Sequence, residues 1–126
     1  MKKALILLAH GARDPEWALP LRRVHAAVQV QRPSQRVELA FLEFMPPDLP
    51  ECAQLLLAEG FGHIVVVPML IAQGGHLKQG IPRLMDELQR QNPLARFELS
   101  GPVGEAESVI RAIAGHVLSI ADDQPI

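Results

Sequence analysis

The chain has few aromatic residues and no strong excess of either charge. Its 126 residues include no tyrosine, one tryptophan and four phenylalanines, and its formal net charge is −2. Proteins that bind nucleic acids usually carry a basic surface, and single-strand binders add aromatic side chains on which bases stack. The composition therefore disfavours nucleic acid as a partner.

Cysteine and long apolar runs are also scarce. Cys52 is the single cysteine, so one chain can form neither a disulfide nor a cysteine-rich metal site, which suits a reducing compartment. The apolar run after Lys2 and Lys3 is short and ends at His10, unlike that of a signal peptide. No other run has the length of a membrane span. We therefore expect a soluble cytoplasmic protein with no membrane partner.

Several motifs of well-known enzyme classes are missing. The sequence contains no Gly-Lys pair and hence no phosphate-binding P-loop. It contains neither an H-E-x-x-H zinc motif nor the G-x-S-x-G turn of serine hydrolases. These absences favour a function that needs no ATP or other nucleotide.

Four short apolar runs divide the chain at regular intervals. The first and third are almost continuously apolar, which is typical of strands buried on both faces of a parallel sheet. With hydrophobic residues at 48%, the length suits one domain over residues 1–126, with a loose tail at 122–126. The runs are Ala4–Ala9, Val37–Phe44, His63–Ile71 and Ala95–Leu99.

Apolar stripes at helical spacing lie between and after these runs. Asp48 with Glu51 resembles a capping box at the start of the second stripe, and Gly60 follows its end. The pattern predicts an α/β fold of order βαβαβαβα: a four-stranded parallel sheet between two helical layers. The stripes are Leu21, Val24 and Val28; Leu49, Ala53, Leu56 and Leu57; Ile81, Leu84, Met85 and Leu88; and Val109, Ile110, Ile113 and Val117.

Three side chains of metal-ligand type fall at the carboxyl ends of the predicted strands. His10 ends the first strand, Glu43 lies near the end of the second, and His76 follows the third in a glycine-rich loop. Ligands of open parallel sheets bind at this edge. Two imidazoles and a carboxylate form a plausible set for a borderline divalent metal ion. We interpret these residues as metal ligands and as the catalytic groups.

Each of these three residues also has a simpler interpretation. His10 can be a hydrogen-bonded residue at a strand end, His76 an exposed loop residue, and Glu43 a side chain turned to solvent by strand alternation. Their shared edge of the predicted sheet favours the metal site. His25, His63 and His116 fall on helices or at the opposite edge and are not expected to join them.

Apolar and basic residues surround the predicted site. Met45 follows the second strand and Leu70 lies near the end of the third, which makes an apolar mouth suited to a flat organic ligand. Arg13 and Lys78 flank it and can bind carboxylates of that ligand.

Several longer stretches resemble a known family. "LILLAHGARDP", "VELAFLEFMPPDLPE", "VVVPMLIAQGGHLKQGIP" and "GPVGE" are similar to the small sirohydrochlorin chelatases of the cobalamin and siroheme pathways. The resemblance covers nearly the whole chain. It implies a chelatase-like fold and ATP-independent insertion of Co²⁺, with Fe²⁺ or Ni²⁺ as alternatives, into sirohydrochlorin.

The resemblance also implies site residues and an assembly. The family's two histidines fall on His10 and His76, and its glutamate falls on Glu43. Gly80 stands where the family often has an acidic residue. The small family members resemble half of their two-domain relatives and form homodimers, so we expect a homodimer with the cleft between subunits.

Two other functions use similar residues. A non-catalytic carrier of metal or tetrapyrrole needs the same ligands as a chelatase. A histidine phosphatase also has His-Gly after a strand, but there an arginine directly precedes the histidine, whereas this chain has Ala9.

Overall fold

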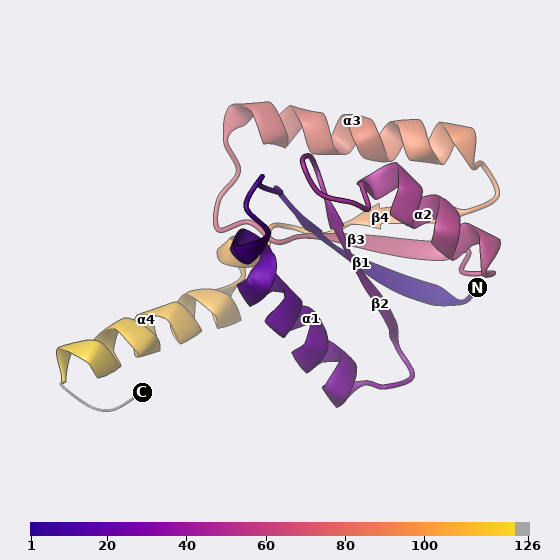
Figure 1. Ribbon diagram of the computed structural model, residues 1–126. Coiled ribbons are helices and arrows are strands. Elements are labelled where there is room, and N and C mark those ends of the chain that lie inside the picture. The colour runs from indigo at the N-terminus through magenta and orange to yellow at the C-terminus, as the bar shows by residue number, and fades with distance from the viewer. Residues whose placement is uncertain (123–126) are drawn as a thin grey trace.

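A parallel four-stranded sheet forms the centre of the structure, a computed structural model that describes residues 1–122 (Figure 1). The strand order is β2-β1-β3-β4, and every neighbouring pair runs parallel. The predicted α/β fold is thereby confirmed. The strands are β1 (Lys3–Ala9), β2 (Arg36–Phe41), β3 (His63–Pro68) and β4 (Arg96–Leu99).

Helices lie on both sides of this sheet. In Figure 1, α2 and α3 lie on one side and α1 lies on the other, while α4 points away from the sheet. Short 3₁₀ turns precede α1 and α4. The helical elements are η1 (Pro15–Ala18), α1 (Leu19–Gln31), α2 (Leu49–Ala58), α3 (Gly75–Gln91), η2 (Val103–Glu105) and α4 (Glu107–Ala121).

Local sequence signals account for the ends of α2. The Asp48 side chain accepts from the Glu51 N–H at 2.9 Å, and the Glu51 side chain accepts from the Asp48 N–H at 3.0 Å. This reciprocal pair is the predicted capping box. Gly60, two residues after the helix, has a positive φ of 94°. A glycine adopts that conformation without steric cost, so the chain can leave α2 there.

Three element boundaries differ from the sequence prediction. β2 ends at Phe41 instead of residue 44, because the chain turns back so that the Phe41 N–H donates to the Pro47 carbonyl at 2.9 Å. β3 ends at Pro68 instead of residue 71. The predicted glycine-rich loop is already helical from Gly75, where α3 starts. The prediction of a loose tail concerns, apart from Asp122, residues outside the described range.

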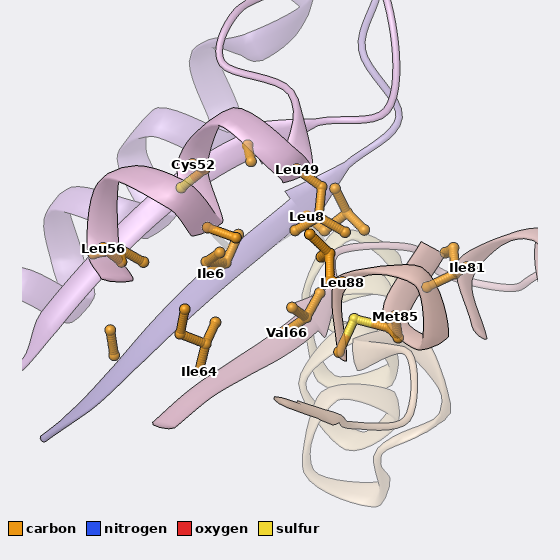
Figure 2. Packing of buried hydrophobic residues seen from close by; sticks show 13 residues of the cluster. Ile6, Leu8, Leu49, Cys52, Leu56, Ile64, Val66, Ile81, Met85 and Leu88 are labelled. Carbon is orange, nitrogen blue, oxygen red and sulfur yellow. The ribbon is translucent and has the colours of Figure 1, made fainter. Parts of the chain in front are cut away.

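The larger buried cluster lies between the sheet and helices α2 and α3 (Figure 2). Even-numbered residues of β1 point to this side because side chains alternate along a strand. Odd-numbered residues of β1 and β2 form a second cluster, and Leu21 and Val28 of α1 pack against it. The labelled members of the larger cluster are Ile6, Leu8, Leu49, Cys52, Leu56, Ile64, Val66, Ile81, Met85 and Leu88.

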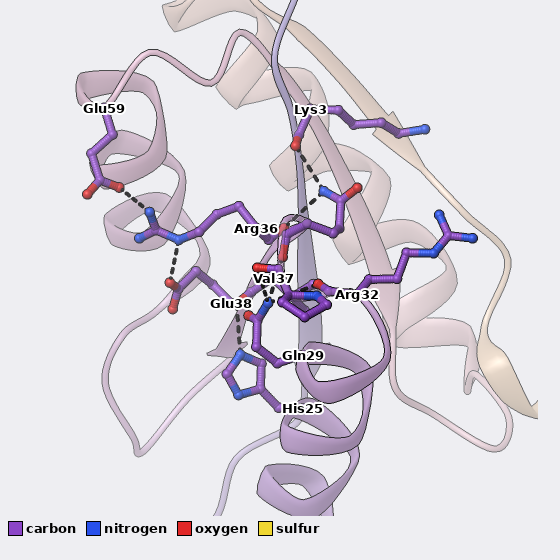
Figure 3. A network of polar contacts seen from close by, with 10 residues as sticks. Lys3, His25, Gln29, Arg32, Arg36, Val37, Glu38 and Glu59 are labelled. Carbon is purple, nitrogen blue, oxygen red and sulfur yellow. Dashed lines mark hydrogen bonds and ion pairs between the residues drawn. The ribbon is translucent and has the colours of Figure 1, made fainter.

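A polar network joins α1 to the start of β2 (Figure 3). The Gln29 side chain donates to the Gln35 carbonyl at 2.9 Å, and the Gln35 side chain donates to the Lys3 carbonyl at 3.0 Å. His25 donates from Nε2 to the Val37 carbonyl at 2.7 Å. His25 is therefore a structural residue that holds α1 against β2.

The position of α4 departs from the predicted helical layers. None of its residues is buried, and its contacts are mainly with η2. In the described part of the chain, the side of the sheet that carries α1 thus has one helix in place of two. Within residues 1–122, no helix combines the length and apolar character needed to cross a membrane.

We predict that Leu8→Ala destabilises the fold by about 2–5 kcal/mol, because Leu8 is fully buried in the central strand and its truncation leaves a cavity. Val30→Ala is the control, since Val30 is exposed. Urea unfolding measures both. Equal free energies of unfolding for the two variants would contradict the assigned core.

Candidate functional site

His10 and Glu43 come into contact just beyond the ends of β1 and β2. His10 Nδ1 lies 3.6 Å from Glu43 Oε1, and the two side chains are 48% and 50% exposed. The contact is possible because parallel pairing continues past the strands: the Leu42 N–H donates to the Ala9 carbonyl at 2.9 Å and the Glu43 N–H to the His10 carbonyl at 3.1 Å. The imidazole and the carboxylate are thus held side by side and open to solvent.

Gly11 makes this close approach possible. Its φ is 96°, a conformation that residues with a Cβ adopt only at a cost. A Cβ at this position would lie 1.9 Å from the Glu43 carbonyl oxygen. The glycine of the His-Gly pair therefore lets the backbone of residue 11 pack directly on that of Glu43.

His76 reaches the same edge of the sheet from the first turn of α3. It is the second residue of that helix, and its side chain is exposed. The N–H groups of Leu77 and Lys78 donate to the Gly74 carbonyl at 3.1 and 3.0 Å. The glycine-rich sequence predicts a loop at His76, whereas in the structure a regular helical turn sets its position.

One pocket of about 330 Å³ contains all three predicted residues. The remaining lining residues come from the loop after β2 and from α3. A larger depression of about 800 Å³ lies along the far half of α3 and contains none of the predicted residues. The lining of the smaller pocket is His10, Leu42, Glu43, His76, Leu77, Gly80, Ile81 and Leu84.

The pocket brings the three groups together without assembling a metal site from them. Within residues 1–122, no three side chains of histidine, cysteine, aspartate or glutamate lie close enough to hold one ion. His10 and Glu43 form the contacting pair, and His76 lines the same pocket. The roles of these residues as metal ligands and catalytic groups stay a prediction.

Two residues predicted to contact the ligand lie away from this pocket. Met45 packs against the second cluster, on the side of the sheet that carries α1. Leu70 packs against the larger cluster. Neither lines the pocket. The loop of residues 42–47 turns back on β2, and this turn directs Leu42, rather than Met45, into the pocket lining.

The two basic residues are exposed beside the site. The Arg13 guanidinium carbon lies 4.7 Å from the centre of the ring of Phe44, the residue that follows Glu43 in the sequence. Lys78 lies two residues after His76 and is exposed. Neither residue lines the pocket, so any contact that they make with a ligand occurs at the rim of the pocket.

Sequence reasoning missed most of the apolar lining. Leu77, Ile81 and Leu84 project from α3 at the spacing of one helix face. The sequence shows this spacing for Ile81 and Leu84, where it predicts a helix face but does not distinguish a pocket lining from core packing. Gly80 lies among them, and a Cβ built on it meets no atom within 4 Å. The pocket therefore has room for a side chain at this position.

The other histidines and the cysteine lie away from the pocket. His63 begins β3 at the opposite edge of the sheet, with Nε2 3.3 Å from Glu98 Oε1, and His116 is exposed on α4. Burial raises the pKa of the Cys52 thiol to about 12, so this thiol is unreactive at neutral pH. The hydrogen bond from Arg36 to Glu38 raises the pKa of the guanidinium group.

The sequence profile of one protein family, CbiX, matches residues 4–119. The chain belongs to the CbiX family. The match extends from β1 into α4 and so includes all three residues at the pocket.

Two curated relatives of this CbiX chain have the same name. A protein of Saccharolobus islandicus named sirohydrochlorin cobaltochelatase is 43% identical over 81 residues, which are 64% of this chain and 62% of that protein. A protein of the same name from Methanococcus aeolicus is 32% identical over 83 residues, which are 66% of this chain and 58% of that protein. The matches thus span about three fifths of the relatives' length.

Solved structures share the fold of this CbiX chain. A cobalamin (vitamin B12) biosynthesis CbiX protein from Marinobacter aquaeolei has a TM-score of 0.85 at 24% identity, with 97% of this chain and 99% of that chain covered. SirB from Bacillus subtilis with Fe³⁺ has a TM-score of 0.80 at 25% identity, with 95% and 48% covered. The sirohydrochlorin chelatase SirB in complex with cobalt has a TM-score of 0.76 at 27% identity, with 96% and 52% covered.

We predict that Gly11→Ala destabilises the fold more than Gly60→Ala. Both glycines have a φ near 95°, but a Cβ clashes with the Glu43 backbone only at Gly11. Gly60→Ala should cost about 1–2 kcal/mol, the strain of the left-handed conformation. Urea unfolding compares the variants. Equal losses would show that the His10–Glu43 backbone contact relaxes easily.

Proposed function

We propose that this chain inserts a divalent metal ion into sirohydrochlorin without ATP. Co²⁺ is the first candidate metal, and Fe²⁺ and Ni²⁺ are the alternatives. The names of the curated relatives support the reaction, and the relatives solved with Fe³⁺ and with cobalt support a transition metal as substrate. The product then belongs to cobalamin or siroheme synthesis.

The pocket with two histidines and a glutamate is the observation on which this proposal rests. His10, Glu43 and His76 line one cavity at the carboxyl edge of a parallel sheet, where ligands of such sheets bind. Imidazole nitrogens and a carboxylate oxygen suit Co²⁺ and Fe²⁺. All three side chains are solvent-exposed, so a metal ion from solution can reach them.

Metal insertion requires the hydrated ion to lose water. Neutral His10 and His76 can replace water ligands and hold the ion at the pocket, ready for transfer to the ring nitrogens. An ion held by only these few side chains would keep coordination positions free for the macrocycle. An open coordination shell is what a protein needs when it must release the ion to its substrate.

The macrocycle must also lose two protons from its ring nitrogens. Histidine accepts protons near neutral pH, and the Glu43 carboxylate lies 3.6 Å from His10 Nδ1. In the proposed reaction His10 first helps His76 to hold the ion and, once the ion has passed to the ring, accepts a proton together with Glu43.

The surroundings of the pocket suit a broad substrate with carboxylate groups. Arg13 and Lys78 are exposed at the rim and can pair with those carboxylates. Met45 and Leu70, which were predicted to contact the substrate, do not line the pocket and pack against the two buried clusters. Phe44 and Ile71, in the loops after β2 and β3, expose apolar surface, which supports a homodimer whose cleft lies between two subunits. The single cysteine suits a reducing compartment and supports a cytoplasmic location.

We predict that His10→Ala and His76→Ala each lower the insertion rate at least about 100-fold, since even residues behind metal ligands contribute about 10–100-fold. The assay mixes protein, sirohydrochlorin and Co²⁺, Fe²⁺ or Ni²⁺ without oxygen and follows the absorbance of the macrocycle. His63→Gln is the matched control, because His63 lies at the opposite edge of the sheet.

Two results would contradict the proposed reaction. The first is a wild-type rate no higher than that of metal and substrate alone with any of the three ions. The second is near-normal insertion by both His10→Ala and His76→Ala. Circular dichroism checks that the variants stay folded, which is expected because both side chains are exposed.

We predict a smaller effect for Glu43→Gln. A general base usually contributes about 100-fold or more, but His10 shares this task, so the loss should be smaller and should change with pH. The substitution removes a carboxylate beside His10 that can accept a ring proton. The pH profile of the insertion rate tests this, and an unchanged rate and profile would make Glu43 a structural residue.

A further inference from the structure

Helix α3 leaves a gap in the wall of the pocket. His76, Gly80 and Leu84 all line the pocket and lie four residues apart, so they follow one another along one face of the helix. Eight residues span about 12 Å along a helix axis, and Gly80 places no side chain in the middle of that span. A Cβ built on Gly80 meets no atom within 4 Å. We call the space over Gly80, between His76 and Leu84, the α3 gap.

The packing of the protein does not account for glycine at this position. A Cβ at Gly11 or Gly104 would lie 1.9 or 2.1 Å from a backbone oxygen, whereas the space over Gly80 is empty. Gly80 is also not among the glycines with a positive φ. Gly115 of α4 shares both properties but is not part of the pocket. Gly80 is therefore distinguished by its place in the pocket wall.

The side chains around the α3 gap are mainly apolar. Leu77 and Leu84 line the pocket from α3, and Leu42 lines it from the loop after β2. Ile81 is fully buried and closes the pocket toward the core. His76 is the polar group of the same helix face. An apolar cavity with a few polar groups suits an organic ligand, and here it suits the edge of a flat ring.

The size of the pocket admits only part of a macrocycle. Its volume is about 330 Å³, at the lower end of the range of about 300–1,000 Å³ for small-molecule sites. A tetrapyrrole with its carboxylate side chains is larger than most ligands of such sites, so it must enter by one edge. Of the eight described lining residues, Gly80 alone has no side chain, and the α3 gap therefore offers the least obstructed entry.

We infer that Gly80 is a specificity-determining residue for the proposed chelation. One edge of the macrocycle enters the α3 gap and lies against the helix backbone, and a larger side chain at position 80 excludes it. The gap is one helical turn, about 5 Å, from His76, so a ring seated there lies next to the ion that His76 holds in the proposed reaction. The inference rests on the proposed function for the identity of the ligand, whereas the ion alone does not need the gap.

The first experiment measures binding of the macrocycle without metal. Sirohydrochlorin is titrated without oxygen into wild-type protein, Gly80→Ala and Gly80→Leu, and its absorbance is followed. A change of one methylene group in an apolar site alters discrimination about 10–200-fold, so Gly80→Leu should raise the Kd at least about 10-fold and Gly80→Ala should raise it less. Gly115→Leu is the matched control: it replaces a helical glycine away from the pocket and should bind like the wild type.

The second experiment separates the macrocycle from the ion. Equilibrium dialysis measures the binding of Co²⁺ alone to the wild type and to Gly80→Leu. Because position 80 offers no ligand atom in either protein, we expect equal Kd values, whereas a substitution that merely distorted the pocket would weaken both ligands. Circular dichroism and urea unfolding check the fold. Both variants remove a glycine from a helix interior, so they should unfold at no lower urea concentration than the wild type.

Three results would overturn the role of Gly80. An unchanged affinity of Gly80→Leu for sirohydrochlorin shows that the macrocycle does not enter the α3 gap. An equal loss in Gly115→Leu shows that the effect does not come from the pocket. An equal loss of Co²⁺ binding in Gly80→Leu shows that position 80 acts on the metal site and not on the macrocycle.

Failure of the proposed reaction gives a different pattern. A wild type that binds sirohydrochlorin, and loses this binding in Gly80→Leu, but inserts no metal supports the role of Gly80 in a carrier and excludes the chelatase. A wild type that does not bind sirohydrochlorin at all overturns both the proposed function and the role of Gly80.

Discussion

The backbone contact between residue 11 and Glu43 is the constraint on which the pocket depends. Parallel pairing carries the chain past the ends of β1 and β2, so that the Glu43 N–H still reaches the His10 carbonyl. A side chain at residue 11 would fill this space. The contact sets the imidazole of His10 beside the Glu43 carboxylate at 3.6 Å. The ends of these two strands thus place a titratable histidine and a carboxylate side by side.

Helix α3 supplies the other wall of the pocket and links it to the core. Its first turn carries His76, and the same helix continues through Ile81 and Leu84. Ile81 is also fully buried in the larger cluster. The packing that holds α3 on the sheet therefore also fixes the distance between His76 and the His10–Glu43 pair. Stability and pocket geometry depend on the same apolar contacts, while His10, Glu43 and His76 remain exposed.

Much of this architecture was predictable because its signals are local. The apolar runs, the capping box at Asp48 and the helical stripes predicted the order of strands and helices, and the structure confirms that order. The pocket residues were predictable because all parallel strands end at one edge. Strand ends were less accurate, since the reversal of residues 42–47 depends on the bond from Phe41 to Pro47 across the loop.

The sequence by itself determined which residue types reach the carboxyl edge: His10, Glu43 and His76 follow from strand order and local turns. Only the tertiary structure decided which neighbours line the pocket. Met45 faces the other side of the sheet, and Leu42 lines the pocket instead of Met45. The path of a loop depends on contacts between residues that are distant in the sequence. The direction of α4 was likewise set by the packing of η2 on the loop after β3, whereas the amphipathic pattern of α4 states only that some apolar surface must cover it.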